Sequence, residues 1–195
     1  MPGPSTWTPL LRRGVLLEAV TLGWNVAGIV VLTITALAAR SVALAGFGLD
    51  SLIEIGASTV VIWELSGTGV RRQALALRII GGAFVVLALY LAVQSTLVLV
   101  ARYHPHHSQL GIAWTSATAV VMFLLAAGKR TTGRQLGNPV LETEGRVTFV
   151  DGLLATAVLV GLVLNSWRGW WWADPLAGYV ILVYGVKEGW AALRR

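Results

Sequence analysis

The sequence contains no cysteine and has few charged residues. Without thiols the chain cannot form a disulfide, and a metal site would have to use oxygen or imidazole ligands. Asp, Glu, Lys and Arg together make up 12% of the 195 residues, about half the share that is usual in soluble domains. Hydrophobic residues make up 56%. This balance excludes an ordinary water-soluble fold and indicates an integral membrane protein.

The apolar residues form six runs, each close to or above the roughly 20 residues that a helix needs to cross the hydrocarbon core. We therefore expect an all-α, integral membrane bundle of six transmembrane helices that forms a single domain over residues 1–195. The first run follows two arginines, as a signal peptide would, but its apolar part is about twice as long as in such a peptide. We expect it to remain as a helix. The runs are 14–39, 41–65, 74–101, 110–127, 147–164 and 175–193.

Positive charges are distributed unequally between the two sides of this bundle. If the N-terminus is cytoplasmic, three of the fifteen Lys and Arg residues fall on the outer side, namely Arg40, Arg102 and Arg168. Because basic connections are retained in the cytoplasm, both termini are expected there. The net charge of +6 then reflects topology and does not point to nucleic acid. The inner residues are Arg12, Arg13, Arg71, Arg72, Arg78, Lys129, Arg130, Arg134, Arg146, Lys187, Arg194 and Arg195.

Acidic residues interrupt the second and fifth apolar runs. Asp50 and Glu54 are four residues apart, so they share one face of a helix. Glu144, Thr148 and Asp151 are spaced four and three apart and share a face in the same way. An ionisable group at bilayer depth costs at least about 2.5 to 3.5 kcal/mol, and such groups mark ion or proton pathways. The pattern therefore predicts a cation or proton pathway between these two helices.

The segment Ser-Val-Ala-Leu at 41–44, followed by Gly-Phe-Gly-Leu-Asp-Ser-Leu-Ile-Glu at 46–54, resembles the second-helix signature of the cation diffusion facilitator (cation efflux) family. Residues 147–161 resemble the second metal-binding helix of that family, and Trp-Ala-Asp-Pro at 172–175 resembles the start of its last span. The similarity covers essentially the whole chain. It is strongest to the short six-helix branch that has no cytosolic C-terminal domain.

The resemblance implies a transporter and not an enzyme. It implies a homodimer that moves a divalent metal ion, Zn²⁺ in relatives of this branch, out of the cytoplasm in exchange for protons by alternating access. A bacterial inner membrane is the expected location, and no resident cofactor is expected. The metal ligands would be Asp50, Glu54 and Asp151. Val147 occupies the fourth ligand position and cannot coordinate a metal, so a non-transporting membrane scaffold or accessory protein is the alternative.

The chemistry of the carboxylate ligands says little about which metal ion is bound, but it supports an exchange of metal ion for protons. Three carboxylates form a hard oxygen site that suits Mn²⁺ or Mg²⁺ as well as Zn²⁺. Carboxylates clustered in a medium of low dielectric constant tend to hold protons when no cation is bound, and they release those protons to bind a metal ion. Competition between metal ion and protons for the same oxygens is what an antiporter requires.

Other polar positions have two interpretations each. Asn25 coordinates the ion or hydrogen-bonds a ligating carboxylate, or it joins two helices. Glu144, with Thr148 beside it, is a ligand at the entrance of the pathway, although we favour a solvated carboxylate near Arg146. For Glu18 we favour a side chain that extends to the membrane surface.

The connection between the third and fourth runs contains all three histidines, His104, His106 and His107. Clustered histidines can bind metal, but the family's histidine-rich loop lies elsewhere, so we favour an ordinary polar loop. A second connection, residues 165–175, contains four of the nine tryptophans. This composition predicts anchoring at the membrane surface.

Overall fold

The computed structural model describes residues 8–39, 41–67, 70–102, 106, 108–172 and separate positions between 175 and 190. Five helices follow one another: α1 (Pro9–Ala39), α2 (Val42–Leu65), α3 (Val70–Ala101), α4 (Gln109–Leu136) and α5 (Pro139–Arg168). All five are long and apolar enough to cross a membrane. The prediction of an all-helical membrane bundle is thus confirmed for the described residues. Most of the sixth predicted span lies outside them, so that helix and the cytoplasmic termini stay predictions.

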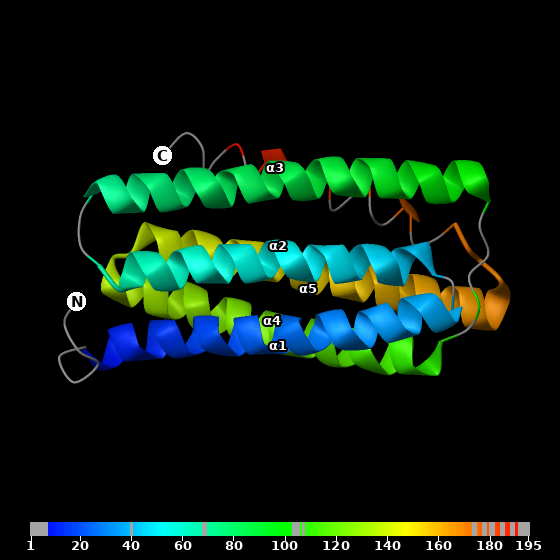
Figure 1. Ribbon diagram of the computed structural model, residues 1–195, viewed down its shortest axis with the longest axis horizontal. Helices are drawn as coiled ribbons and strands as arrows, with labels where there is room; N and C mark the ends of the chain where they lie inside the picture. Colours follow the sequence, from blue (N-terminus) through cyan, green and yellow to red (C-terminus); the bar gives the residue numbers. More distant parts are fainter. Residues whose placement is uncertain are drawn as a thin grey trace.

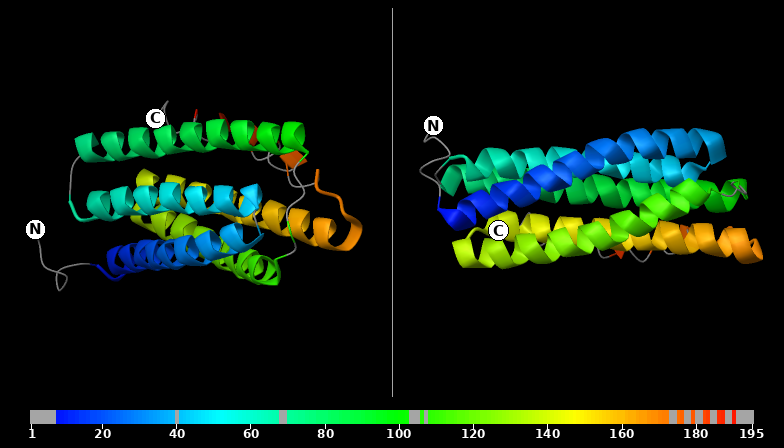
Figure 2. Two further views of the ribbon diagram at one scale, coloured as in Figure 1. Left: turned by 45° about the vertical axis from the view of Figure 1, so that its right-hand side comes forward. Right: turned by 90° about the horizontal axis from the view of Figure 1, so that it is seen from below.

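Four of the helices surround the centre of the bundle. Neighbours along the chain run in opposite directions (Figure 1). Helix α1 packs against α2 and α4, and α5 packs against the same two helices, while α3 contacts α2 and α5 from outside. The left-hand view of Figure 2 shows α3 and α1 on opposite sides of the bundle. Side chains that point inward from α1, α2, α4 and α5 can therefore meet in one place.

Local capping signals explain where α4 and α5 are divided. Helix α4 ends at Leu136 and is capped by Gly137, which has a left-handed φ of 62°, a conformation that glycine adopts without steric cost. The Asn138 side chain accepts hydrogen bonds from the backbone N–H groups of Val140 and Leu141, and Pro139 occupies the first helical position. The predicted runs stop at 127 and resume at 147, so hydropathy misplaced the end of α4 and the start of α5. Charged residues lower the hydropathy of this stretch without interrupting the helices.

Close contact between α4 and α5 depends on two glycines. A Cβ atom at Gly133 would lie 2.7 Å from the backbone nitrogen of Glu142. A Cβ at Gly145 would lie 2.9 Å from the backbone nitrogen of Arg130. Any larger residue would have to push the helices apart, as is common where membrane helices pack through small residues. This packing brings the inward-facing residues of α4 within reach of α5.

The turn between α4 and α5 is also joined to the end of α2. The Nδ2 atom of Asn138 donates hydrogen bonds to both carboxylate oxygens of Glu64, at 3.0 and 3.3 Å. Glu64 is buried. One side chain thus caps α5 and fixes it to α2 at this end of the bundle.

The opposite end of α5 exposes aromatic residues. Trp167, Trp170 and Trp172 are exposed to solvent in the isolated chain, and the rings of Trp170 and Trp172 stack with centroids 5.4 Å apart. The Arg168 guanidinium lies over the Trp167 ring, 4.8 Å from its centroid. This arrangement fits an aromatic belt at a membrane surface.

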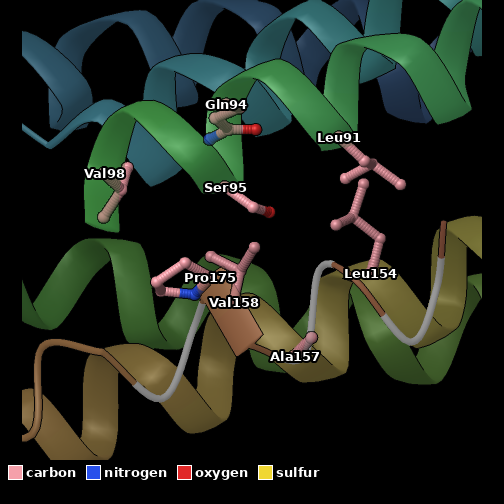
Figure 3. Close-up of a pocket in the computed structure, with 8 residues that line it drawn as sticks. All are labelled: Leu91, Gln94, Ser95, Val98, Leu154, Ala157, Val158 and Pro175. Carbon is pink, nitrogen blue, oxygen red and sulfur yellow. The ribbon is translucent and has the colours of Figure 1, made fainter. Parts of the chain in front are cut away.

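A small cavity separates α3 from α5. Side chains of Gln94 and Ser95 on α3 line it, opposite Leu154 and Val158 on α5, with Pro175 at its edge (Figure 3). Its volume of about 20 Å³ is enough for one water molecule. A space of this size with mostly apolar walls does not provide the coordination that a metal ion needs.

Candidate cation site

The interior of the bundle contains a cluster of buried charged residues. Each of the four central helices contributes one: Glu18 from α1, Glu54 from α2, Lys129 from α4 and Glu144 from α5. All four side chains are buried. None of the described side chains of α3 takes part in the ion pairs of this cluster.

Lys129 lies at the centre of this cluster. Its side chain is 0% exposed, and its Nζ lies 2.9 Å from Glu18 Oε2, 3.1 Å from Glu144 Oε1 and 4.0 Å from Glu54 Oε1. Three carboxylates thus surround one ammonium group. Ion pairs are stronger in a medium of low dielectric constant than in water, and a buried charge without a partner is strongly destabilising. The cluster therefore fixes α1, α4 and α5 to one another.

Thr148 connects Lys129 with Glu54. Its hydroxyl oxygen accepts a hydrogen bond from Lys129 Nζ at 2.9 Å. The same hydroxyl donates to Glu54 Oε1 at 2.7 Å. Thr148 thus hydrogen-bonds Glu54, one of the three expected ligands.

Asp50 and Asp151 form a second acidic group beside this cluster. They come from α2 and α5, both are 3% exposed, and their carboxyl groups lie within hydrogen-bonding range of each other. The Oδ2 atom of each has no hydrogen-bond partner among the described residues. About one turn along their helices lie Glu54 on α2, a member of the charged cluster, and Thr148 on α5, which hydrogen-bonds Lys129. The two groups are therefore continuous.

The expected ligands are close together without forming a ready coordination shell. Among the described residues, no three acidic or histidine side chains are placed so that they could hold a metal ion together. Asp50 and Asp151 face each other, whereas Glu54 interacts with Thr148 and Lys129. Val147 is 3% exposed and belongs to the apolar core. The position of the family's fourth metal ligand therefore contributes no polar group to the site.

Three interpretations drawn from the sequence are wrong. Glu18 does not extend to the membrane surface, and Glu144 is not solvated, because both are fully buried against Lys129. Lys129, which was counted as a charge outside the membrane, lies inside α4 and inside the bundle. Glu142 is the more exposed neighbour, and it pairs with Arg134 and Arg146 at 3.7 and 3.6 Å.

A signal for this cluster is present in the sequence. The buried stripe of α1 contains Gly14, Glu18, Thr21, Asn25 and Gly28, at intervals of three or four residues. Small and polar residues at this spacing mark the face of a membrane helix that packs against other helices. Glu18 lies on this stripe. Hydropathy averaged over the whole helix does not show the stripe, because the large apolar residues of α1 dominate the average.

Asn25 and the histidines take no direct part in the described ion pairs. The Nδ2 atom of Asn25 donates to the backbone oxygen of Thr21 within α1, at 3.0 Å, so this bond is not the expected link between helices. His106 is exposed, and its backbone N–H donates to the Ala39 oxygen at 3.1 Å. His104 and His107 lie outside the described residues.

Comparison with known proteins identifies the family of this chain. The cation efflux transmembrane domain matches residues 18–195. The chain is similar to transmembrane protein 163 of Xenopus laevis, with 24% identity over 151 residues, which are 73% of this chain and 54% of that protein. The chain thus spans about half the length of this relative. The match extends over both acid-bearing helices, and the chain belongs to the cation efflux family.

Proposed function

We propose that the protein moves a divalent metal cation, with Zn²⁺ as the first choice, out of the cytoplasm in exchange for protons by alternating access. Asp50, Glu54 and Asp151 would be its ligands, and the family resemblance implies a homodimer. The Asp50 and Asp151 pair carries the proposal. Two buried carboxyl groups face each other across α2 and α5, each with an oxygen that has no described hydrogen-bond partner, and this arrangement favours a bound cation.

Electrostatics supports the choice of a cation. Five acidic residues, Glu18, Asp50, Glu54, Glu144 and Asp151, are buried around one buried lysine. An excess of carboxylates in a low-dielectric interior requires protons or another cation to balance the charge. A divalent ion that displaces protons meets this requirement, and this exchange is the physical basis of the proposed antiport.

The decisive experiment is metal uptake into proteoliposomes that contain the purified protein. With an acidic lumen, protons leave as metal enters, so uptake of Zn²⁺ is expected to be faster than without a pH gradient. Uptake should fall when a protonophore collapses the gradient. Parallel measurements with Mn²⁺, Co²⁺ and Cd²⁺ would define the cargo. An uptake rate that does not depend on the pH gradient would contradict antiport. Absence of uptake for all four ions would favour the scaffold alternative.

Cysteine labelling can test the proposed cytoplasmic termini, since the native chain has no cysteine to remove. His106 and Gln135 are exposed residues at opposite ends of the bundle. In intact cells His106→Cys is expected to react with a membrane-impermeant maleimide, whereas Gln135→Cys should react only after permeabilisation. The reverse pattern would place the termini outside the cytoplasm.

A further inference from the structure

Lys129 brings a positive charge into the interior of a bundle whose proposed cargo is also positive. Glu18 and Glu144 hold its ammonium group at 2.9 and 3.1 Å, and Glu54 lies farther away, at 4.0 Å. Thr148 accepts a hydrogen bond from Lys129 and donates one to Glu54. The Glu54 carboxylate is therefore attracted to Lys129 directly and is also fixed by the hydroxyl group between them.

This attraction explains why the three expected ligands do not form a coordination shell. Asp50 and Asp151 offer a metal ion two carboxylates, and the third must come from Glu54. Glutamate can reorient through several staggered side-chain torsions. Reorientation toward the aspartates, however, breaks the hydrogen bond from Thr148 at 2.7 Å and moves negative charge away from Lys129.

We propose that Lys129 is an internal competitor of the transported cation. Its ammonium group attracts Glu54 when no metal is bound, and a metal ion binds by drawing Glu54 away to Asp50 and Asp151. Glu18 and Glu144 continue to pair with Lys129, so the ammonium keeps partners when Glu54 leaves. This proposal rests on the proposed function and makes Lys129 a positioning residue, which weakens metal binding and accelerates release.

Equilibrium Zn²⁺ binding to the purified full chain, measured with a competing fluorescent chelator, tests this role. Lys129→Gln is expected to bind Zn²⁺ at least about tenfold more tightly than wild type, a change of about 1.4 kcal/mol. Thr148→Val removes the hydroxyl that fixes Glu54 and should also tighten binding, by a smaller factor. In uptake assays Lys129→Gln should lower KM and kcat together, because tighter binding slows release.

Two variants separate competition from general effects of charge and folding. Lys187→Gln removes the same charge from an exposed position and should leave Zn²⁺ affinity unchanged. Lys129→Arg keeps a positive charge and should restore affinity toward the wild-type value. If Lys129→Gln does not fold, the double variant Lys129→Gln/Glu18→Gln, which removes one charge of each sign, takes its place.

The results distinguish this proposal from the proposed function. If wild type binds Zn²⁺ but a folded Lys129→Gln or double variant binds it equally or less tightly, competition by Lys129 is wrong and the transporter proposal stands. If wild type neither binds nor transports any of the four metal ions, both proposals fail. Tighter binding in Lys129→Gln and Thr148→Val, with no change in Lys187→Gln, supports the competition.

Discussion

Asp50→Asn is expected to reduce metal uptake at least about hundredfold, equivalent to about 2.7 kcal/mol of lost binding. The asparagine keeps the shape of the side chain and removes its negative charge. Asp50 is buried, and one of its oxygens has no hydrogen-bond partner among the described residues, so loss of its charge is expected to affect cation binding more than folding. Asp151→Asn should behave in the same way.

Uptake into proteoliposomes is the measurement, and size-exclusion elution in detergent checks that the variants fold. Glu142→Gln is a matched control, because it also neutralises an acidic residue but at a half-exposed position paired with Arg134 and Arg146. This control should transport at the wild-type rate. If Asp50→Asn retained uptake within a factor of about two, the residue could not be an essential ligand.

Lys129→Ala is expected to destabilise the protein by about 3–5 kcal/mol, the usual effect of removing one partner from a buried ion pair. The substitution leaves three buried carboxylates without their common cation, since Glu18, Glu54 and Glu144 all lie within 4.0 Å of Lys129. Glu18→Ala should destabilise the protein less, because Lys129 keeps Glu144 at 3.1 Å.

Thermal denaturation of the detergent-solubilised protein measures this difference. The melting temperature should fall most for Lys129→Ala and less for Glu18→Ala, and the double variant should be less destabilised than the sum of the two, because the residues interact directly. Equal, additive decreases would mean that the two residues contribute independently, and an unchanged melting temperature for Lys129→Ala would contradict the role of the buried cluster.

Hydropathy predicted the helices well because long apolar runs have one stable form in a bilayer, where every backbone polar group must be satisfied within the segment. Its misplacement of the end of α4 and the start of α5 has a physical cause. Arg130 and Arg134 end an apolar run, but they do not end a helix, which requires a signal such as the left-handed Gly137. Because charged residues mark the end of the predicted span, the predicted run stops at 127, whereas α4 continues to Leu136.

The acidic pairs could be located from the sequence, but their partners could not. Spacing within one helix shows that Asp50 and Glu54 share a face, whereas the contact between Lys129 and Glu18 joins positions far apart in the chain. Only the packing of α1 against α4 establishes it. Lys129 lies just beyond the predicted run 110–127, where basic residues ordinarily mark the membrane surface. Its burial could therefore not be recognised from the sequence.

The bond between Asn138 and Glu64 gives α2 and α5 a common pivot. Asp50 is 14 residues from Glu64 along α2, a lever arm of about 21 Å at 1.5 Å per residue. A tilt of about 5° around this pivot would displace Asp50 by about 2 Å, far more than the roughly 0.2 Å by which metal–ligand distances vary. Small rotations near this fixed end would thus displace Asp50 by more than the proposed metal site could tolerate.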